Sequence, residues 1–250
     1  MKILTRWWRN ETLKTDFFSN VSHEFKTPLA VIYNNAQLLQ KSISADSEQA
    51  DYVESILDST KRLSNLIQNM LKLNKLEKQT IQPMPETYDV CAQLCDCIIQ
   101  FDDSMEKKNI DFEADMEDEA YICADPGLME LVWNNLMSNA LKFTPDGGKI
   151  RLLQKRAENY IQISVLDNGC GMDDKVKKHI FDKFYQGDES HATHGNGLGL
   201  ALVKRVLELT DGHITVESKP QKGTTFTVFM PIAENVMDMQ QDRTENETVK

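Results

Sequence analysis

Two long apolar stripes near the start of the chain limit its fold more than any other feature. Between Phe18 and Leu39, apolar side chains recur in steps of three, four, four, three, four and three residues. A second stripe with similar spacing extends from Val53 to Asn74. This spacing places the side chains on one face of an α-helix, close to the seam of a coiled coil. The sequence therefore predicts two long helices, with Pro28 expected to kink the first.

A polar segment, residues 41–49, separates the two stripes and predicts a loop. Two long helices joined by a short loop form an antiparallel hairpin. One hairpin cannot bury two broad apolar stripes by itself, whereas two hairpins in a four-helix bundle can. We therefore expect a homodimer.

The pattern changes after a linker at residues 79–86 that contains two prolines. Beyond it the sequence predicts alternating elements: helices at 90–105, 127–143 and 198–210, and strands at 110–112, 121–123, 149–154, 160–166, 213–218 and 224–230. The expected fold class is α+β in two domains, a helical hairpin forming a dimeric four-helix bundle and then an α/β sandwich. The expected boundaries are 1–13 for an N-terminal segment or stub, 14–78, the linker, 87–232, and 233–250 for a disordered tail.

Composition excludes several classes of protein. The 250 residues carry a formal net charge of −11, and the basic residues are scattered, which disfavours a nucleic-acid partner. No apolar run approaches the roughly 18 residues that span a bilayer. Residues 1–10 contain two Trp and three basic residues, so they fit a membrane-interface segment, a stub of a missing upstream membrane segment, or a plain helix start. Contact with a membrane is expected only through such an upstream segment.

The five cysteines argue against a disulfide framework, because their number is odd and the chain is long enough to form a core. Cys91, Cys95 and Cys97 do not have a zinc-binding spacing. We expect them to be small core residues in a reducing cytoplasm.

Amides and a lysine interrupt the apolar pattern of the segment 134–143. Asn135, Asn139 and Lys142 are spaced four and three residues apart, so they share one helical face. Two amides beside an ammonium group suggest a polar ligand that has oxygens and a bound cation. Taken alone, the segment is equally compatible with a solvated helix face.

Two glycine-rich segments follow in the sequence. Asp167-Asn168-Gly169-Cys170-Gly171 comes directly after a predicted strand, where its glycines allow close approach to a flat ligand and Asp167 can accept a hydrogen bond from an exocyclic amine. Taken alone, it also fits a simple turn. The segment from Gly195 through Gly197, Leu198 and Gly199 opens a predicted helix, whose free backbone amides suit phosphate.

The first helix carries a candidate nucleophile, His23, which lies off the apolar stripe. An exposed neutral imidazole is a competent nucleophile near neutral pH. Glu24 is adjacent and can orient the ring or take its proton. Thr27 lies one turn further on the same face and can position a water. By itself, an exposed helical histidine is usually an ordinary surface residue.

In order along the chain, these segments closely resemble the transmitter core of bacterial sensor histidine kinases over residues 14–232. SHEFKTPL is similar to the H box, NNLMSNALKF to the N box, DNGCGM to the G1 box, FDKF to the F box, GNGLGLAL to the G2 box and GTTF to the last glycine motif. The resemblance implies a dimerisation and histidine-phosphotransfer domain followed by a catalytic ATP-binding domain of the Bergerat fold. It implies autophosphorylation from Mg²⁺·ATP, and transfer to an Asp in the receiver domain of a response regulator. A cytoplasmic location follows, alone or as the cytoplasmic part of a membrane-bound sensor.

The resemblance also implies roles for individual residues. His23 would be the phospho-acceptor, Glu24 its acid–base neighbour, and Thr27 would serve removal of phosphate from the regulator. In the ATP site, Asn139, helped by Asn135, would bind Mg²⁺, and Asp167 would bind the adenine amine. The remaining residues would contact base or phosphates: Lys142, Phe143, Gly169, Gly171, Gly195, Gly197, Leu198, Gly199 and Thr224.

The chain departs from the family pattern at two places. Gln186 stands where many relatives have an Arg after the F box, and the last motif lacks its earlier glycine. Such an Arg can stabilise the charge of a transferring phosphoryl group and so increase the rate of transfer by about a thousandfold. Gln186 therefore supports one rival hypothesis, a degenerate nucleotide-binding scaffold without kinase activity. A second rival, a related Bergerat ATPase or serine kinase, is disfavoured because such proteins need no histidine-bearing hairpin.

Overall fold

The computed structural model describes residues 25, 27–43, 48–78, 82–187 and 196–233. The chain divides into two compact units, Met1–Ile81 and Gln82–Lys250. Within the described ranges, no helix combines the length and apolar character that crossing a bilayer requires.

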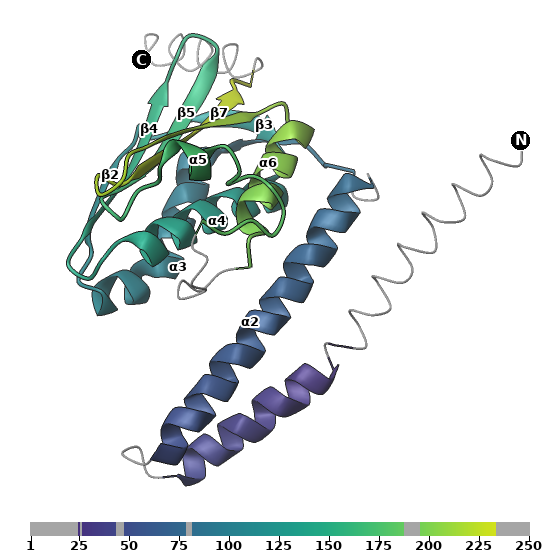
Figure 1. Ribbon diagram of the computed structural model, residues 1–250. Helices are drawn as coiled ribbons and strands as arrows, with labels where there is room; N and C mark the ends of the chain where they lie inside the picture. The colour runs from purple at the N-terminus through teal and green to yellow at the C-terminus, as the bar shows by residue number, and fades with distance from the viewer. Residues whose placement is uncertain (1–24, 26, 44–47, 79–81, 188–195, 234–250) are drawn as a thin grey trace, which may run out of the picture. The chain divides into compact units, whose positions relative to one another are not determined.

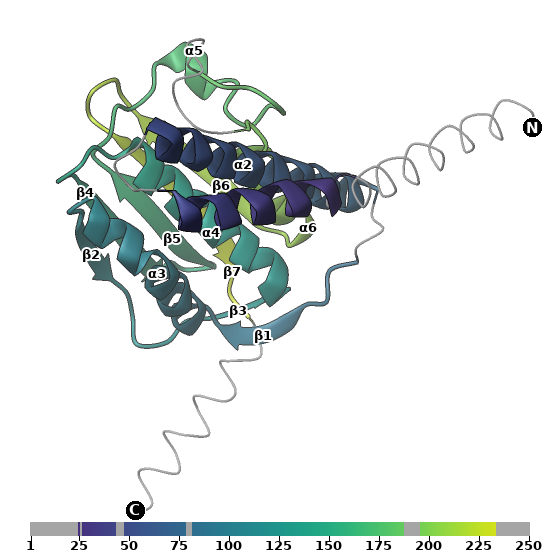
Figure 2. The ribbon, with the colours of Figure 1, turned by 90° about the horizontal axis from the view of Figure 1, so that it is seen from below.

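The first unit is the predicted helical hairpin. Residues 27–42 are helical, and α2 (Glu48–Glu77) runs back alongside them (Figures 1 and 2). Residues 41, 42, 48 and 49 are thus helical, although the sequence predicted them as part of a loop at 41–49. Ala36, Val53 and Leu57 form a small buried cluster between the two helices, with Tyr33 and Ile43 packed against it.

The hairpin buries only part of its apolar stripes. Leu29 and Leu73 are buried, but several large apolar side chains that lie in the stripes or beside them remain exposed in the single chain. These are Phe25, Val31, Ile32, Leu38, Leu39, Tyr52, Ile56 and Leu63. Because monomeric proteins rarely expose so many apolar side chains on one element, these residues form a candidate contact surface.

The second unit is a two-layer α/β sandwich, in agreement with the predicted fold class. Its sheet has the order β2-β4-β5-β7-β6 and is antiparallel except for the parallel pair β2 and β4. The strands are β2 (Asp111–Asp115), β4 (Lys149–Arg156), β5 (Tyr160–Asp167), β6 (His213–Ser218) and β7 (Thr224–Pro231). Alternate residues of β4, β5 and β7 are buried, which is the pattern of a sheet covered on one face.

Three helices cover that face of the sheet (Figures 1 and 2). They are α3 (Val90–Lys107), α4 (Pro126–Phe143) and α6 (Gly199–Leu209). The sequence predicted all three, but it did not predict the four-residue helix α5 (Asp174–Lys177). Nor did it predict the strand β1 (Glu86–Asp89), which pairs with β3 (Tyr121–Ala124) in a separate two-stranded sheet.

Two aspartates set where α3 and α4 begin. Asp89 caps α3 by accepting from the amide of Cys91, and it also accepts from the Ala120 amide. Asp125 caps α4 by accepting from the Leu128 amide, with a proline in the first turn. Each cap satisfies an amide that the helix itself leaves unpaired, so each aspartate fixes both a helix start and its neighbouring segment.

The cysteines on α3 differ from the expectation at one position. Cys91 and Cys97 are buried, and burial raises the pKa of each thiol to about 12. Cys95 is exposed, because it lies outside the buried stripe of this helix, which includes Leu94. The prediction that all three are core residues was therefore wrong for Cys95.

Gln93 connects α3 to α4 and to β1. Its side-chain oxygen accepts from the indole nitrogen of Trp133 at 2.8 Å and from the Tyr88 hydroxyl at 2.9 Å. Its nitrogen donates to the carbonyl of Pro126 at 2.8 Å. Trp133 is almost completely buried, so Gln93 supplies the acceptor that its N–H needs.

We expect Gln93→Ala to lower the free energy of unfolding by about 2 kcal/mol, because it leaves the buried Trp133 N–H without an acceptor. Urea unfolding can be followed by Trp133 fluorescence in a background where Trp7 and Trp8 are replaced by Phe. The matched control is Gln100→Ala on the exposed face of the same helix, with an expected effect below about 0.5 kcal/mol. Equal effects of the two substitutions would contradict this role of Gln93.

Candidate functional site

The predicted amide and lysine face of α4 lies at the boundary between buried and exposed surface. Asn135 donates from its side chain to the Leu131 carbonyl at 2.6 Å. Its oxygen lies 2.6 Å from where a Cβ on Gly199 would be, so Asn135 packs directly against the start of α6. Asn139 is half-buried, and its side-chain amide makes no hydrogen bond to any residue in the described ranges. Its oxygen is therefore available to a ligand.

Lys142 and Phe143 end this helix. The ammonium of Lys142 lies 4.5 Å from the centroid of the Phe143 ring, and that ring is 38% exposed. Burial lowers the pKa of Lys142, and no carboxylate in the described part of the chain offsets this effect. An anionic ligand beside the ammonium would favour its charged form.

Lys108, which follows α3, holds the end of α4 in place. Its ammonium donates to the carbonyls of Leu141 at 2.8 Å and Thr144 at 2.7 Å. The last carbonyls of a helix lack partners within the helix and carry partial negative charge, so a lysine stabilises them. The sequence analysis did not find this residue, because nothing in the local sequence links Lys108 to a helix more than thirty residues away.

Asp167 ends β5 inside the covered face of the sheet. Its carboxylate accepts from the Gly169 amide at 2.8 Å and also from the Thr224 amide. Burial raises the pKa of Asp167, and the two amide hydrogen bonds partly oppose that rise. The carboxylate is thus an incompletely compensated acceptor, which suits a donor on a ligand.

The two glycines after Asp167 are required by close backbone contacts. A Cβ on Gly169 would lie 2.3 Å from the carbonyl oxygen of Phe143. Gly171 has φ +64°, and a Cβ there would lie 1.9 Å from the carbonyl oxygen of Lys219. The loop after β5 therefore rests directly on the end of α4, which no larger residue would allow.

The start of α6 presents backbone amides, of which that of Leu198 donates to the side-chain oxygen of Asn196 at 3.2 Å. Leu198 is the N-cap residue, and no side-chain hydrogen bond caps the helix there. Gly197 has φ +65°, and its carbonyl accepts from the Phe184 amide at 2.8 Å. An uncapped helix N-terminus of this kind favours an anion.

The second unit thus brings most of the predicted site residues together. The contacts between Gly169 and Phe143 and between Gly199 and Asn135 join the β5 loop, α4 and α6 at one place. Gly195 lies outside the described residues, as do His23 and Glu24. Thr27 belongs to the helical unit and is exposed.

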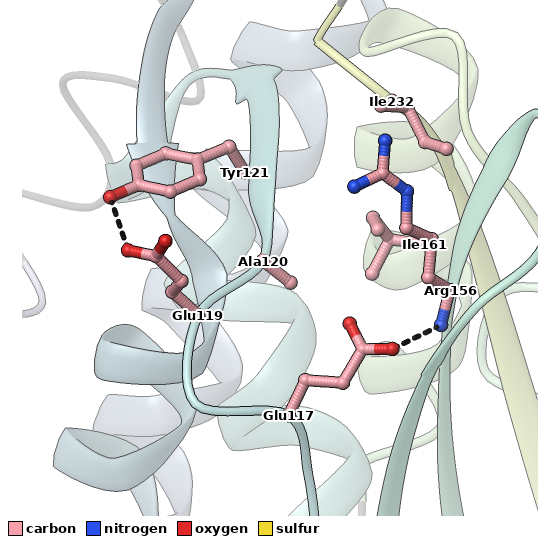
Figure 3. A pocket seen from close by; sticks show the side chains of 7 residues that line it. All are labelled: Glu117, Glu119, Ala120, Tyr121, Arg156, Ile161 and Ile232. Carbon is pink, nitrogen blue, oxygen red and sulfur yellow. Dashed lines mark hydrogen bonds between the residues drawn. The ribbon is translucent and has the colours of Figure 1, made fainter. Parts of the chain in front are cut away.

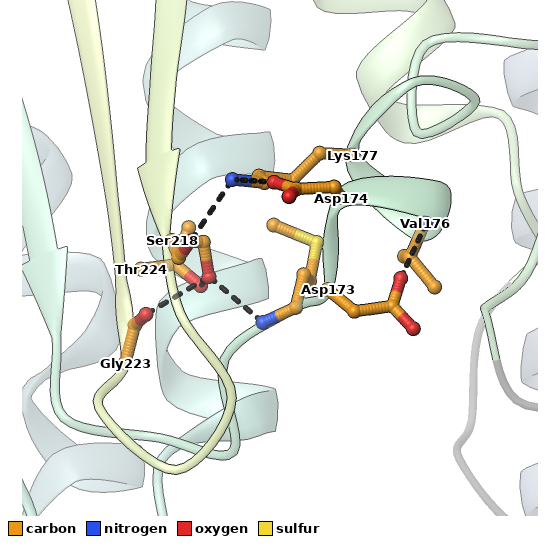
Figure 4. A network of polar contacts seen from close by, with 8 residues as sticks. Asp173, Asp174, Val176, Lys177, Ser218, Gly223 and Thr224 are labelled. Carbon is orange, nitrogen blue, oxygen red and sulfur yellow. Dashed lines mark hydrogen bonds and ion pairs between the residues drawn. The ribbon is translucent and has the colours of Figure 1, made fainter.

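Thr224 takes part in a polar network behind this site (Figure 4). Its hydroxyl lies 3.0 Å from the Ser218 hydroxyl, which also contacts the Gly223 carbonyl at 2.9 Å and the Met172 amide at 2.8 Å. Lys177 donates to the Ser218 carbonyl and pairs with Asp174. The sequence analysis did not identify Ser218, because a serine near the end of a strand carries no distinctive signal.

A small pocket lies at the other end of β5 (Figure 3). Glu117, Glu119, Ala120, Tyr121, Arg156, Ile161 and Ile232 line it. Ile161 is near the start of the strand that Asp167 ends. Its acidic lining also differs from a phosphate site, so this pocket is separate from the site described above.

Comparisons with known proteins identify both units. Residues 13–79 match the His Kinase A (phospho-acceptor) domain, and residues 124–234 match the histidine kinase-, DNA gyrase B- and HSP90-like ATPase family. The sensor-like histidine kinase SenX3 of Mycobacterium tuberculosis is 32% identical over 225 residues, which is 89% of this chain and 55% of that protein. The chain therefore spans about half the length of such curated relatives.

Solved structures agree with this assignment. Full-length ShkA in complex with AMPPNP has a TM-score of 0.72 and 27% identity, covering 87% of this chain and 46% of that one. The histidine kinase ThkA in complex with the response regulator TrrA shares the fold, with a TM-score of 0.63, 20% identity and coverage of 93% and 66%. The chain belongs to the sensor histidine kinases and comprises the two domains of their transmitter core.

We expect Gly169→Ala to lower the free energy of unfolding by about 2 kcal/mol, because the new methyl group would overlap the Phe143 carbonyl. It should also weaken binding of a fluorescent ATP analogue at least tenfold, since the loop must move. Gly127→Ala in the first turn of α4 is the matched control: a Cβ there has ordinary space, and it should stabilise by up to about 1 kcal/mol. Unchanged nucleotide binding by Gly169→Ala would contradict the site.

Proposed function

We propose that this chain is an ATP-dependent protein-histidine kinase that phosphorylates itself on His23. One observation supports the proposal: close backbone contacts bring the end of α4, the loop after Asp167 and the start of α6 together. The same chain carries a phospho-acceptor domain that includes His23. A separate binding function for the second unit would not need that histidine-bearing hairpin.

The residues of the site fit Mg²⁺·ATP. Asp167 would accept a hydrogen bond from the adenine amine, with Gly169, Gly171 and Thr224 around the base and Phe143 near it. Asn139, helped by Asn135, would bind Mg²⁺; its amide oxygen is free in the described ranges, and oxygen is the ligand that Mg²⁺ prefers. Lys142 would contact phosphate. The amides of the segment Gly195, Gly197, Leu198 and Gly199 would surround the phosphates.

The proposed reaction is a direct transfer of the γ-phosphoryl group to His23. An imidazole nitrogen of His23 forms a bond to the γ-phosphorus while the bond from that phosphorus to the bridging oxygen of ADP breaks. Glu24 takes the proton that leaves the imidazole. Catalysis would consist mainly of positioning and of charge neutralisation by Lys142 and the helix amides, and Mg²⁺ would add to this neutralisation when bound.

The phosphoryl group then passes to an aspartate of a response regulator. A carboxylate oxygen of that aspartate bonds to phosphorus and the N–P bond to His23 breaks, which regenerates the imidazole. Thr27 is exposed and would position a water that hydrolyses the phosphoaspartate of the regulator. The water oxygen would bond to phosphorus while the bond from phosphorus to the carboxylate oxygen breaks, which releases inorganic phosphate. The complex of ThkA with TrrA supports a partner of this type.

We further propose that the helical unit pairs with a second copy in a four-helix bundle in the cytoplasm. Support comes from the apolar side chains that the single hairpin leaves exposed, including Ile32, Leu39, Ile56 and Leu63. Covering them in a bundle would remove this apolar surface from water. Light scattering measures the stoichiometry directly.

We expect His23→Gln to abolish phosphorylation that is labile to acid and stable to base, because glutamine has no nucleophilic ring nitrogen. Nucleotide binding should remain within about twofold of the unmodified chain, since His23 lies in the other domain. The assay is incubation with γ-labelled ATP, then acid or alkali treatment. His213→Gln, an exposed histidine on β6, is the control and should label normally. Retained labelling of His23→Gln would refute the assignment. If the unmodified chain binds nucleotide but is not labelled, the protein is a scaffold rather than a kinase.

We expect Asn139→Ala to weaken ATP binding at least tenfold when Mg²⁺ is present, because it removes the free amide oxygen. Binding measured in EDTA should change by less than about threefold, which isolates the contribution of the cation. Calorimetric titration gives both values. The neighbouring exposed residue supplies the control, Ser138→Ala. Equal losses with and without Mg²⁺ would show that Asn139 does not bind the cation.

A further inference from the structure

Three polar residues form one row across three adjacent strands. Asp167 on β5 pairs directly with Thr224 on β7, and Thr224 pairs directly with Ser218 on β6. Directly opposite residues point to the same face of a sheet, with Cβ atoms about 4.5–5.5 Å apart. The row therefore lies on the helix-covered face and connects the candidate amine acceptor to Ser218 through Thr224.

The Ser218 hydroxyl uses its full hydrogen-bonding capacity. It is buried, and it contacts the Gly223 carbonyl, the Met172 amide and the Thr224 hydroxyl (Figure 4). A hydroxyl has one proton and two acceptor positions. Its proton goes to the Gly223 carbonyl, because a carbonyl only accepts, and the Met172 N–H occupies one acceptor position. The Thr224 hydroxyl must then donate to Ser218 and occupy the second acceptor position of the Ser218 oxygen.

This assignment fixes what Thr224 can offer its other neighbour, Asp167. Its hydroxyl proton is committed to Ser218, so beside the carboxylate the Thr224 oxygen has only acceptor capacity left. The base end of the site therefore presents acceptors. That arrangement favours a base that carries a hydrogen-bond donor, such as an exocyclic amine, at this edge. It disfavours a base without such a donor.

We propose that Ser218 is a positioning residue that sets the base preference of the nucleotide site, an inference that rests on the proposed function. Ser218 retains the Thr224 proton and thereby leaves the Asp167 carboxylate free for the amine of the base. Without Ser218, the Thr224 hydroxyl can turn and donate to Asp167, where it competes with the amine. Ser218 also holds the segment after Gly171 through the Met172 amide.

The test compares ATP with purine riboside 5′-triphosphate, which lacks the amine, in titrations of the full chain. Ser218→Ala should lose about tenfold in ATP affinity and less than about threefold in affinity for the analogue. Its preference for ATP over the analogue should therefore fall by at least about threefold. Ser218→Thr, which restores a hydroxyl, should recover the preference.

Ser164→Ala is the matched control. It removes another cross-strand hydroxyl pair, with Thr227 at 2.9 Å, on β5 and β7 but away from the site. It should leave both affinities unchanged. If Ser218→Ala does not fold, Ser218→Cys keeps the side-chain volume while offering only a weak acceptor, and the preference should fall in the same direction.

The outcomes separate the two proposals. Equal loss of both nucleotides in the Ser218 variants would indicate a merely structural role and overturn the inference, as would an unchanged preference for ATP. Failure of the unmodified chain to bind ATP would instead refute the proposed function itself.

Discussion

The direct contact between the β5 loop and the end of α4 is the constraint on which the nucleotide site depends. The Cα of Gly169 lies against the carbonyl of Phe143, and Lys108 ties the last carbonyls of the same helix. This contact places Asp167, which begins the loop, next to the helix end that carries Lys142. Two turns earlier on α4, Asn135 and Gly199 bring in the start of α6 by the same kind of close packing.

The site contains buried charged groups whose loss of solvation is not fully offset by neighbouring charges or hydrogen bonds. Burial raises the pKa of Asp167, so this carboxylate costs stability above the pKa it has in the unfolded chain. Burial lowers the pKa of Lys142, so its ammonium costs stability below its folded pKa. At neutral pH both groups are therefore unfavourable for the fold alone. A ligand with an amine at one end and phosphates at the other would relieve both costs, as expected of a binding site.

Particular residues show how far the sequence predicts this protein. The helices at 90–105, 127–143 and 198–210 were predicted with small errors at their ends, because their apolar periodicity is strong. β1 was missed, since a four-residue strand beside a proline linker exists only through its pairing with β3. Cys95 was misplaced because a cysteine spacing does not reveal which side of a helix is covered.

Local spacing alone determined which residues are chemically capable: the amides and lysine on one helical face, the aspartate before two glycines, and the histidine off an apolar stripe. These depend on neighbours within a few positions, which periodicity and backbone sterics record. Only the tertiary structure decided which other residues keep these chemical groups in position. Lys108, Gln93 and Ser218 act on segments five to forty-six residues away. Such contacts depend on how helices and strands pack, and packing geometry leaves no local pattern in the sequence.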